Sequence, residues 1–430
     1  MLIWRTFNIT HHVRYIKMKS LYFAKYPHLH FRSPTSVFPK KDKSNQYGNE
    51  AILQPPQRSP RSVAELRRRN RNRPALNGSR PGRPVLPVLA TRPIFRYNGE
   101  SEWRQGEAKP MQTIETESYG LPLEWAGKRF HTWNYEMRQT FGTKVFKVML
   151  DAGFTCPNRD GTIAAGGCTF CSARGSGDFA GSRRDDLVTQ FNTVRDRQHR
   201  KWPEAKYIGY FQAYTNTYAP LATLKEYYEV ILQQPGVVGL SIATRPDCLP
   251  DDVVNYLAEL NERTYLWLEM GLQTVHESTS KLINRAHDTA CYLDAVRRLR
   301  ERGIRVCAHI IYGLPGETRE MMLETGRQVA EMDVQGIKIH LLHLMRKTPM
   351  VRQWREGLVR FLEQDEYVNL VVDTLEMLPP DMIVHRLTGD APRELLIGPM
   401  WSLRKWEVLN AIDAELARRN SWQGKRWKGR

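Results

Sequence analysis

The chain has 430 residues, 41% of them hydrophobic, which is enough to bury a large core in one α/β domain with additions or in several smaller domains. Its formal net charge is +18, but residues 1–110 hold 22 Lys and Arg against 6 Asp and Glu. Residues 111–430 are therefore nearly neutral, and the net charge of the chain does not by itself indicate a nucleic-acid-binding protein. Six unevenly placed cysteines do not suit a secreted disulfide framework, and no stretch reaches the roughly 18 apolar residues of a membrane-spanning helix, so we expect a cytoplasmic chain that binds no membrane.

Residues 1–110 are predicted to be disordered, because runs such as PPQRSPRS and RRRNRNRP are rich in Pro and Arg and lack apolar periodicity. Three interpretations are open: an organellar presequence, a nucleic-acid-binding arm, or upstream sequence translated from a start assigned too early, with Met111 as the natural first residue. We favour the third, because a presequence explains neither the length nor the Pro content. Residues 111–140 then form a lead-in to the folded core.

From residue 141 to residue 345, short β-rich apolar runs alternate with amphipathic segments of helical length. The predicted strands are 144–150, 207–213, 237–244, 264–270, 305–313 and 336–343. The predicted helices lie near 185–200, 221–233, 251–261, 276–302 and 318–332. Apolar strands separated by helices indicate a parallel sheet with right-handed crossovers. The fold class is therefore α/β, and six such units favour a partial, open (βα)6 TIM-like barrel over a complete one.

Residues 346–430 are predicted to form a C-terminal extension of helices and a short strand that closes the open barrel. Its pattern indicates a helix over 366–378, a short strand and polar turn over 385–390, and a final helix over 403–419. The last residues, RRNSWQGKRWKGR, interleave basic residues with tryptophan, and two interpretations are open. They either hold phosphates and stack on bases, or form a frayed basic terminus, which we favour.

One glycine-rich loop, CPNRDGTIAAGGCTFC, places Cys156, Cys168 and Cys171 directly after the first predicted strand, where barrel enzymes carry their chemistry. A closed zinc site needs four ligands, and none of the remaining cysteines has the spacing of a second CxxC pair: Cys248, Cys291 and Cys307. A 4Fe-4S cluster held by three thiolates instead leaves one iron open to a small ligand. The spacing alone favours iron-sulfur over zinc and leaves both open.

The C-x-aromatic-C pattern of CTFC resembles the radical S-adenosylmethionine (SAM) enzymes, and so do segments such as GFTCPNRDGT, YFQAYTNTYAP, LEMGLQT, INRAHD and HIIYGLPGET. Together, over residues 115–420, they resemble a bacterial family related to the Elongator catalytic subunit and the oxygen-independent coproporphyrinogen oxidases. The first cysteine spacing is x11, where most radical SAM enzymes have x3, which leaves the loop geometry open. The resemblance implies a 4Fe-4S cluster on the three cysteines, with SAM at the open iron and reductive cleavage of SAM to a 5'-deoxyadenosyl radical.

The resemblance also implies cofactor-binding roles for seven further residues: Phe170, Gln212, Thr215, Asn216, Gln273, Arg285 and His309. The three between 212 and 216 follow the second strand, where relatives hold the SAM amino group, and which of them does so here is open. Gln273 and Arg285 match a glutamine and an arginine that hold SAM in relatives, the arginine through its carboxylate. For Phe170 and His309 an ordinary packing role is also open, Phe170 as a packed loop residue and His309 as a core histidine.

Substrate-side candidates are titratable residues in otherwise apolar strands, where a charge is costly unless it faces the barrel interior with partners. They are Glu269, Lys338, His340 and His343, and the first three are assigned as catalytic. Tyr214 is interpreted as a packed tyrosine that could also line the mouth of the barrel.

Kinship with the Elongator subunit implies a substrate base in tRNA, a wobble uridine or its 5-substituent, with a flavodoxin-type or ferredoxin-type protein as reductant. Because a fold does not fix a function, three alternatives stay open. They are a radical enzyme acting on a small molecule, a zinc-bound nucleic-acid module without SAM chemistry, and a cluster-binding scaffold that binds SAM but turns nothing over.

Overall fold

The computed structural model describes residues 94–97, 103–106 and 125–429. Within the first two ranges, Ile94–Tyr97 (β1) pairs antiparallel with Trp103–Gly106 (β2). The rest of the segment 1–110, which the sequence predicts to be disordered, lies outside the described residues. Among the described helices, none is long and apolar enough to cross a membrane.

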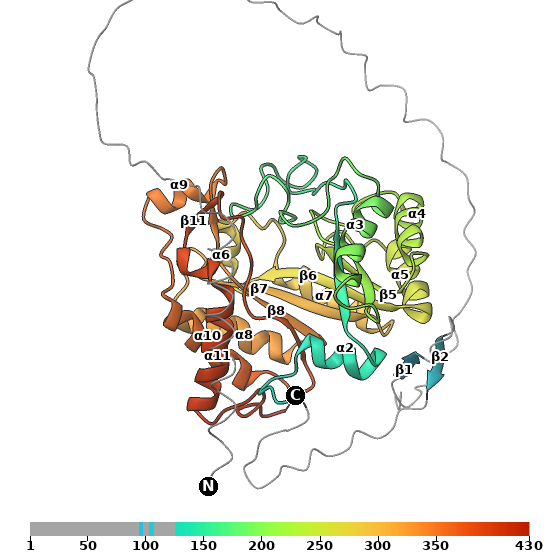
Figure 1. Cartoon of the computed structure of the whole chain (residues 1–430). Coiled ribbons are helices and arrows are strands. Elements are labelled where there is room, and N and C mark those ends of the chain that lie inside the picture. The colour runs from blue at the N-terminus through green and yellow to red at the C-terminus, as the bar shows by residue number, and fades with distance from the viewer. Residues whose placement is uncertain (1–93, 98–102, 107–124, 430) are drawn as a thin grey trace, which may run out of the picture. The chain divides into compact units, whose positions relative to one another are not determined.

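A seven-stranded parallel sheet, curled into a half-barrel, forms the centre of the described chain (Figure 1). The strands stand in the order β10, β8, β7, β6, β5, β4, β3. Their bounds are β3 Val145–Leu150, β4 Lys206–Phe211, β5 Val237–Thr244, β6 Tyr265–Gln273, β7 Arg305–Tyr312, β8 Gly336–Leu341 and β10 Ile383–Arg386. All six strands predicted for the barrel are confirmed, and so is the fold class. The C-terminal extension contributes β10 as a seventh parallel strand beside β8.

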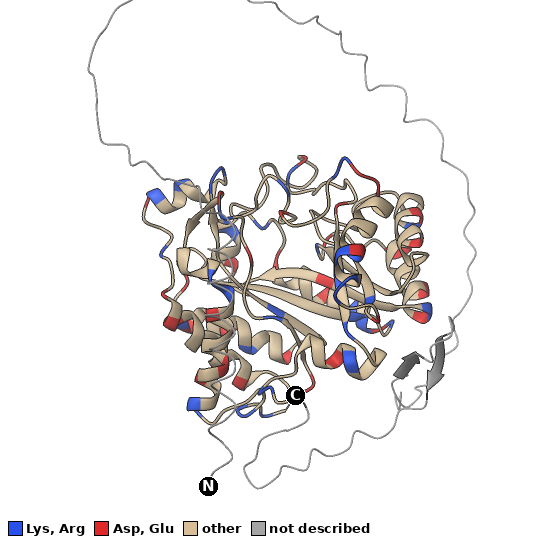
Figure 2. Cartoon of the chain, in the orientation of Figure 1, with Lys and Arg blue, Asp and Glu red and all other residues tan. Residues whose placement is uncertain are grey.

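Helices cover the outer face of the sheet (Figure 1), and acidic and basic residues are mixed along them (Figure 2). Four of the helices expected between strands are confirmed, as α3 Leu187–His199, α4 Leu221–Leu232, α5 Asp251–Arg263 and α8 Arg319–Glu331. In the extension, α10 spans Gln364–Met377 and α11 spans Lys405–Arg418. The patterns did not predict α2 Trp133–Phe141, α9 Met350–Arg355, the 3-10 turn Met400–Leu403 or the pair β9 Leu344–Met345 and β11 Leu396–Gly398.

The single helix predicted over 276–302 is wrong, because the segment forms α6 Glu277–Leu282 and α7 Thr289–Arg300 with a loop between them. Two loop residues, Asn284 and Ala286, have left-handed φ angles of 53° and 61°, which an α-helix cannot contain. The Asp288 side chain then accepts a hydrogen bond from the Cys291 N–H and caps α7. The apolar periodicity of the sequence continues across this break, so the pattern does not reveal where α6 ends and α7 begins.

Side chains of the strands alternate between the helices and the barrel interior. In β6, Leu266, Leu268 and Met270 belong to the main apolar core that the strands share with the outer helices. Trp267 belongs to a second apolar group with Met137 of α2. This second group fills the barrel near the starts of the strands, so a pocket can form only toward their carboxyl ends.

The C-terminal tail packs on the barrel, so our preference for a frayed terminus is wrong. Gln423 is fully buried, and its Nε2 donates to the carbonyl oxygens of Pro379 at 2.6 Å and Met382 at 2.8 Å. Its Oε1 accepts from the His131 N–H at 2.9 Å. The amide therefore joins the tail to the loop before β10 and to the segment before α2.

Replacing Gln423 with alanine is expected to lower the free energy of unfolding by about 2 to 3 kcal/mol, because the His131 N–H and the Met382 carbonyl lose their bonds to the amide and the Pro379 carbonyl keeps only its bond from the Met382 N–H. Urea unfolding measures this difference. Lys428→Ala, an exposed change in the same tail, is the control and should shift stability by less than about 0.5 kcal/mol. Equal stability of the two variants would show that the tail is not docked in solution.

Candidate functional site

A pocket of about 280 Å³ lies at the carboxyl ends of the strands, between the cysteine loop and the barrel interior. Every predicted site residue except Asn216 lines it. The lining includes the three cysteines of the loop, Cys156, Cys168 and Cys171. Residues nearly 190 positions apart in the sequence thus share one cavity, because parallel strands bring their carboxyl ends to the same edge of the sheet.

The cysteine loop is anchored by the break between α6 and α7. Asn158 is fully buried, and its Nδ2 lies 3.5 Å from the Cys168 sulfur and donates to the Asn284 carbonyl at 2.6 Å. In return, the Asn284 Nδ2 donates to the Gly167 carbonyl at 2.9 Å, and the Thr169 N–H donates to the Ile283 carbonyl at 2.9 Å. The INRAHD segment, from which the resemblance implied only a cofactor contact, therefore supports the loop.

Gly175 shows why this loop needs glycine. Its φ is +61°, and a Cβ at this position would stand 2.5 Å from the ring of Tyr214. The Tyr214 hydroxyl donates to the Ala173 carbonyl at 2.6 Å, and the Arg183 guanidinium lies 4.8 Å from the ring centre. Tyr214 is thus a packed residue that also lines the pocket, as the sequence interpretation held.

Burial raises the pKa of Cys168 to about 12 and also raises the pKa of Cys171, while the nearby guanidinium groups of Arg245 and Arg159 pull the two values down. A metal or cluster binds thiolates, so binding would release protons from these thiols. The Ser176 hydroxyl lies 3.4 Å from the Cys171 sulfur, and Arg159 Nη2 donates to the Cys171 carbonyl at 3.0 Å. These donors and cations offset part of the cost of a buried thiolate, although the net effect of the surroundings is to raise the pKa of both thiols.

The donor set fits a 4Fe-4S cluster. Among the described residues, no group of three or more His, Cys, Asp or Glu side chains converges as the ligands of one metal ion do. In a cluster each thiolate binds a different iron, so the ligands surround a larger object and need not converge on a point. Three thiols in one cavity, with cations and amide donors beside them, meet that requirement.

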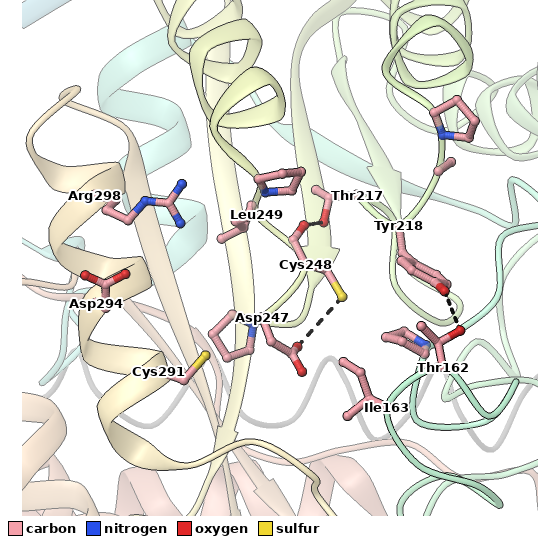
Figure 3. Close-up of a pocket in the computed structure, with 15 residues that line it drawn as sticks. Thr162, Ile163, Thr217, Tyr218, Asp247, Cys248, Leu249, Cys291, Asp294 and Arg298 are labelled. Carbon is pink, nitrogen blue, oxygen red and sulfur yellow. Dashed lines mark hydrogen bonds between the residues drawn. The ribbon is translucent and has the colours of Figure 1, made fainter. Parts of the chain in front are cut away.

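The other three cysteines lie elsewhere. Cys248 and Cys291 line a second, open groove of about 770 Å³ beside the ends of β4 and β5 and the first turns of α7 (Figure 3). There the Cys248 sulfur lies 3.7 Å from the Asp247 carboxylate. Cys307 is fully buried within β7. None of the three lines the pocket with the loop cysteines.

The three candidates that follow β4 have different surroundings. Gln212 donates through Nε2 to the Ser176 carbonyl at 3.0 Å, while its buried Oε1 has no partner among the described residues. Thr215 is buried and lines the pocket. Asn216 does not, because its Nδ2 donates to the carbonyls of Ala213 at 3.1 Å and Ala243 at 2.9 Å. The cofactor contact expected of Asn216 is therefore not supported, since its amide joins the ends of β4 and β5.

Phe170 and Gln273 both line the pocket. Phe170 also packs against an apolar group that includes Ile283, Leu342 and Met350, so the packing role and the role beside a cofactor are compatible. Gln273 ends β6 with a left-handed φ of 59°, which sets the direction of its side chain.

Arg285 directs its guanidinium at backbone carbonyls rather than leaving it free for the SAM carboxylate. It is almost fully buried and not on a solvated helix face; Nη1 donates to the carbonyls of Leu272 and Thr274, each at 2.6 Å. Nε donates to the His287 carbonyl at 2.9 Å, and Nη2 lies 3.4 Å from the Glu277 carboxylate. A free bidentate fork for the SAM carboxylate does not exist in this arrangement, so the role implied by the resemblance is revised to a positioning one.

Arg285→Ala is expected to cost about 2 to 3 kcal/mol in the free energy of unfolding, because three carbonyl acceptors lose a charged donor. Arg298→Ala, which removes a surface pair with Asp251, is the control and should cost at most about 1 kcal/mol. Urea unfolding and calorimetric titration with SAM distinguish the roles. Unchanged stability with SAM affinity lowered more than tenfold would contradict the positioning role and favour direct contact with the cofactor.

Glu269 is the centre of a buried polar network on the interior face of the barrel. Its carboxylate accepts hydrogen bonds from Lys147 Nζ and Ser241 Oγ, each at 2.5 Å, and from His309 Nε2 at 2.9 Å. Lys338 bonds the same carboxylate and reaches the Tyr210 hydroxyl at 3.1 Å. The charged groups come from separate strands and pair with one another across the barrel. Such pairing is needed because an unpaired buried charge is costly.

His385 of β10 and Lys147 of β3 complete this network from the two edge strands. Lys147 Nζ lies 3.2 Å from His385 Nδ1 and 4.1 Å from the centre of the Trp133 ring. We did not predict either residue. Lys147 carries the same signal as Lys338, a cation inside an apolar strand, while β10 was not recognised as part of the sheet.

The charges in the network follow from burial and pairing. Burial alone would raise the pKa of Glu269, but the Lys147 and Lys338 ammonium groups hold it well below its usual value. Burial lowers the pKa of Lys338 to about 8 against the pull of Glu269. Burial, with Lys338 nearby, also lowers the pKa of His309 to about 4, and burial holds that of His340 well below the usual range. At neutral pH the network therefore holds the Glu269 carboxylate beside the Lys338 ammonium group and neutral imidazoles.

Comparisons with known proteins agree with this geometry. Residues 158–329 match the radical SAM superfamily, and residues 334–418 match the radical SAM C-terminal domain. The protein YtqA of Bacillus subtilis (strain 168) is 67% identical over 305 residues, which are 71% of this chain and 95% of that protein.

Two more distant relatives match only part of the chain. Elongator complex protein 3 of Dictyostelium discoideum is 29% identical over 163 residues, 37% of this chain and 28% of that protein. A tRNA uridine(34) acetyltransferase of Dehalococcoides mccartyi (strain CBDB1) is 28% identical over 158 residues, 36% of this chain and 34% of that protein.

Proposed function

The chain belongs to the radical SAM superfamily and is a radical SAM enzyme, as its motifs predicted, and we propose that it modifies a base in tRNA, a wobble uridine or its 5-substituent. The observation that carries the proposal is the single pocket that joins the three loop cysteines to the buried charges of the barrel. In such a pocket a cofactor on the cysteines and a flat base on the polar side chains would face each other.

Cys156, Cys168 and Cys171 would hold the 4Fe-4S cluster, and Gln212 and Thr215, which line the same pocket, would hold the SAM amino group. The unpartnered Gln212 Oε1 is an acceptor suited to that amino group. Bound cluster and SAM supply reductive cleavage of the sulfonium and removal of a hydrogen atom from the substrate. A flavodoxin-type or ferredoxin-type protein would provide the electron.

Glu269, Lys338 and His340 would act on the substrate side. Lys338 donates hydrogen bonds and, with a pKa near 8, can keep or release a proton close to neutral pH. His340 is neutral and offers one donor and one acceptor. A uracil edge presents two carbonyl acceptors flanking one N–H donor, which this pair of side chains can complement. Glu269 would keep Lys338 in position from below.

The substrate class is supported by the match to a tRNA uridine(34) acetyltransferase, which covers about a third of each chain. The test is nucleoside mass spectrometry of tRNA from a bacterium whose gene for this protein is deleted. We expect the loss of one modified uridine, restored by the unaltered gene and not by Cys168→Ala. An unchanged set of tRNA nucleosides, together with an altered small metabolite, would contradict the tRNA assignment and favour a small-molecule substrate.

A further inference from the structure

A basic and aromatic surface lies beside the pocket, on the segment 346–360 around α9. We call it the α9 surface, and its exposed side chains are Arg346, Lys347, Arg352, Trp354, Arg355, Leu358 and Arg360. The segment holds five cations and one acid, Glu356. Its net charge of +4 exceeds the net charge of the whole of residues 111–430, so the segment is one of the basic stretches of this part of the chain. The ribbon at α9 is coloured blue in Figure 2 where it carries Lys and Arg residues.

The α9 surface adjoins the cysteine loop directly. The Met350 N–H donates to the carbonyl of Thr169, which lies between Cys168 and Cys171, at 2.9 Å. Gln353 Nε2 donates to the Leu282 carbonyl, beside the loop's anchor, at 2.7 Å. Met345, immediately before the segment, lines the pocket itself. A chain bound to the α9 surface would therefore pass the pocket mouth.

Most of the cations are free to bind a ligand. Among the described residues, none forms an ion pair with Arg346, Lys347 or Arg355. Arg352 pairs with Glu356 and Arg360 with Glu366, but both arginines are well exposed, and exposed pairs are worth at most about 1 kcal/mol.

The aromatic part of the surface is already ordered. The exposed Trp354 ring stacks on Phe361, with ring centres 6.2 Å apart and planes 22° apart. A supported tryptophan beside cations matches the pattern of single-stranded nucleic-acid binding, where phosphates bind the cations and bases stack on the ring.

A second exposed stretch that combines basic residues with a tryptophan lies away from the pocket, at the end of α3. Arg197, Arg200, Lys201 and Trp202 are exposed at the end of α3, just before β4 begins. They lie at the strand starts, which the second apolar group separates from the pocket. Composition alone would select these stretches and the C-terminal tail as well, whereas the α9 surface is the one that bonds to the cysteine loop in the described part of the chain.

We propose that the α9 surface binds the RNA strand next to the target nucleotide, its cations contacting phosphates and Trp354 stacking on an unpaired base. The proposal rests on the proposed function, since it specifies how a tRNA base would be presented to the pocket. Enzymes that act on a base must take it out of the stack, and a stacking platform beside the pocket compensates for the lost stacking of a neighbouring base.

The experiment measures binding of an unmodified tRNA transcript to the full-length protein by fluorescence anisotropy. The KCl concentration is varied from about 50 to about 200 mM, because binding through phosphate contacts weakens strongly over this range. The test variant is Arg346→Gln/Lys347→Gln/Arg355→Gln, and the matched control is Arg197→Gln/Arg200→Gln/Lys201→Gln. Both remove three charges, and residues 1–110 contribute equally to each. SAM cleavage without RNA should be the same in both and reports an intact site.

We expect the test variant to bind at least tenfold more weakly, with a slope of log K against log salt reduced by about 2 to 3, and the control to match the unaltered protein. Trp354→Ala should weaken binding about 5- to 100-fold without changing the slope. If the unaltered protein binds tRNA and the test variant binds equally well, this inference alone is wrong. If the unaltered protein cleaves SAM but shows no salt-dependent tRNA binding, the tRNA substrate class is contradicted as well.

Discussion

Cys156→Ala, Cys168→Ala and Cys171→Ala should each abolish the iron-sulfur content of anaerobically reconstituted protein, which is expected to hold about four irons per chain when unaltered. All three thiols line one pocket, and an alanine leaves an iron without its ligand. Loss of the cluster should abolish SAM cleavage in each variant. Iron and sulfide assays, with the visible absorption spectrum, measure the first effect.

Cys307→Ala is the matched control, because its thiol is fully buried in β7 and does not line the pocket. It should retain iron and activity. If the Cys168 and Cys171 variants keep full iron content while variants of Cys248 or Cys291 lose it, the ligand assignment is wrong and the groove in Figure 3 would be the metal site.

Glu269→Gln is expected to lower the free energy of unfolding by about 3 to 5 kcal/mol, because it leaves Lys147 and Lys338 facing one another in the barrel without their carboxylate. Because the folded-state pKa of Glu269 is depressed, the stability it supplies is complete above its usual pKa and is lost as the pH falls through the lower folded value. The difference between the variant and the unaltered protein should therefore narrow in acid. Urea unfolding at several pH values measures both effects.

A surface pair provides the control for this change. Glu331→Gln removes an exposed partner of Arg327 and should cost at most about 1 kcal/mol. Glu269→Gln/Lys338→Met should regain part of the loss, since it removes one of the two unpaired cations. A cost below about 1 kcal/mol for Glu269→Gln alone would show that the network does not hold buried charge in solution.

The barrel could be predicted because its strands carry their own signal. Apolar strands at regular spacing gave six strands of the sheet, and a polar residue among apolar neighbours marked Glu269, Lys338 and His340 as facing the interior. The same rule would have found Lys147. The cysteine loop was recognisable because ligand residues must recur at fixed spacing whatever surrounds them.

Contacts between distant segments could not be predicted. Asn216 follows β4 and Arg285 lies in the loop between α6 and α7, and only the folded chain shows that backbone carbonyls occupy their donors. Asn284 supports the cysteine loop from 117 residues away, a relation without periodicity or local pattern. The tail around Gln423 resembles a polar terminus until its buried acceptors on Pro379 and Met382 are known.

The most direct test of the assignment is the fate of SAM itself. Full-length protein is reconstituted anaerobically with iron and sulfide, reduced with dithionite and incubated with SAM, and the products are separated by chromatography. The account predicts 5'-deoxyadenosine and methionine from the unaltered protein and neither from Cys168→Ala. A colourless protein with stoichiometric zinc that leaves SAM intact would contradict it.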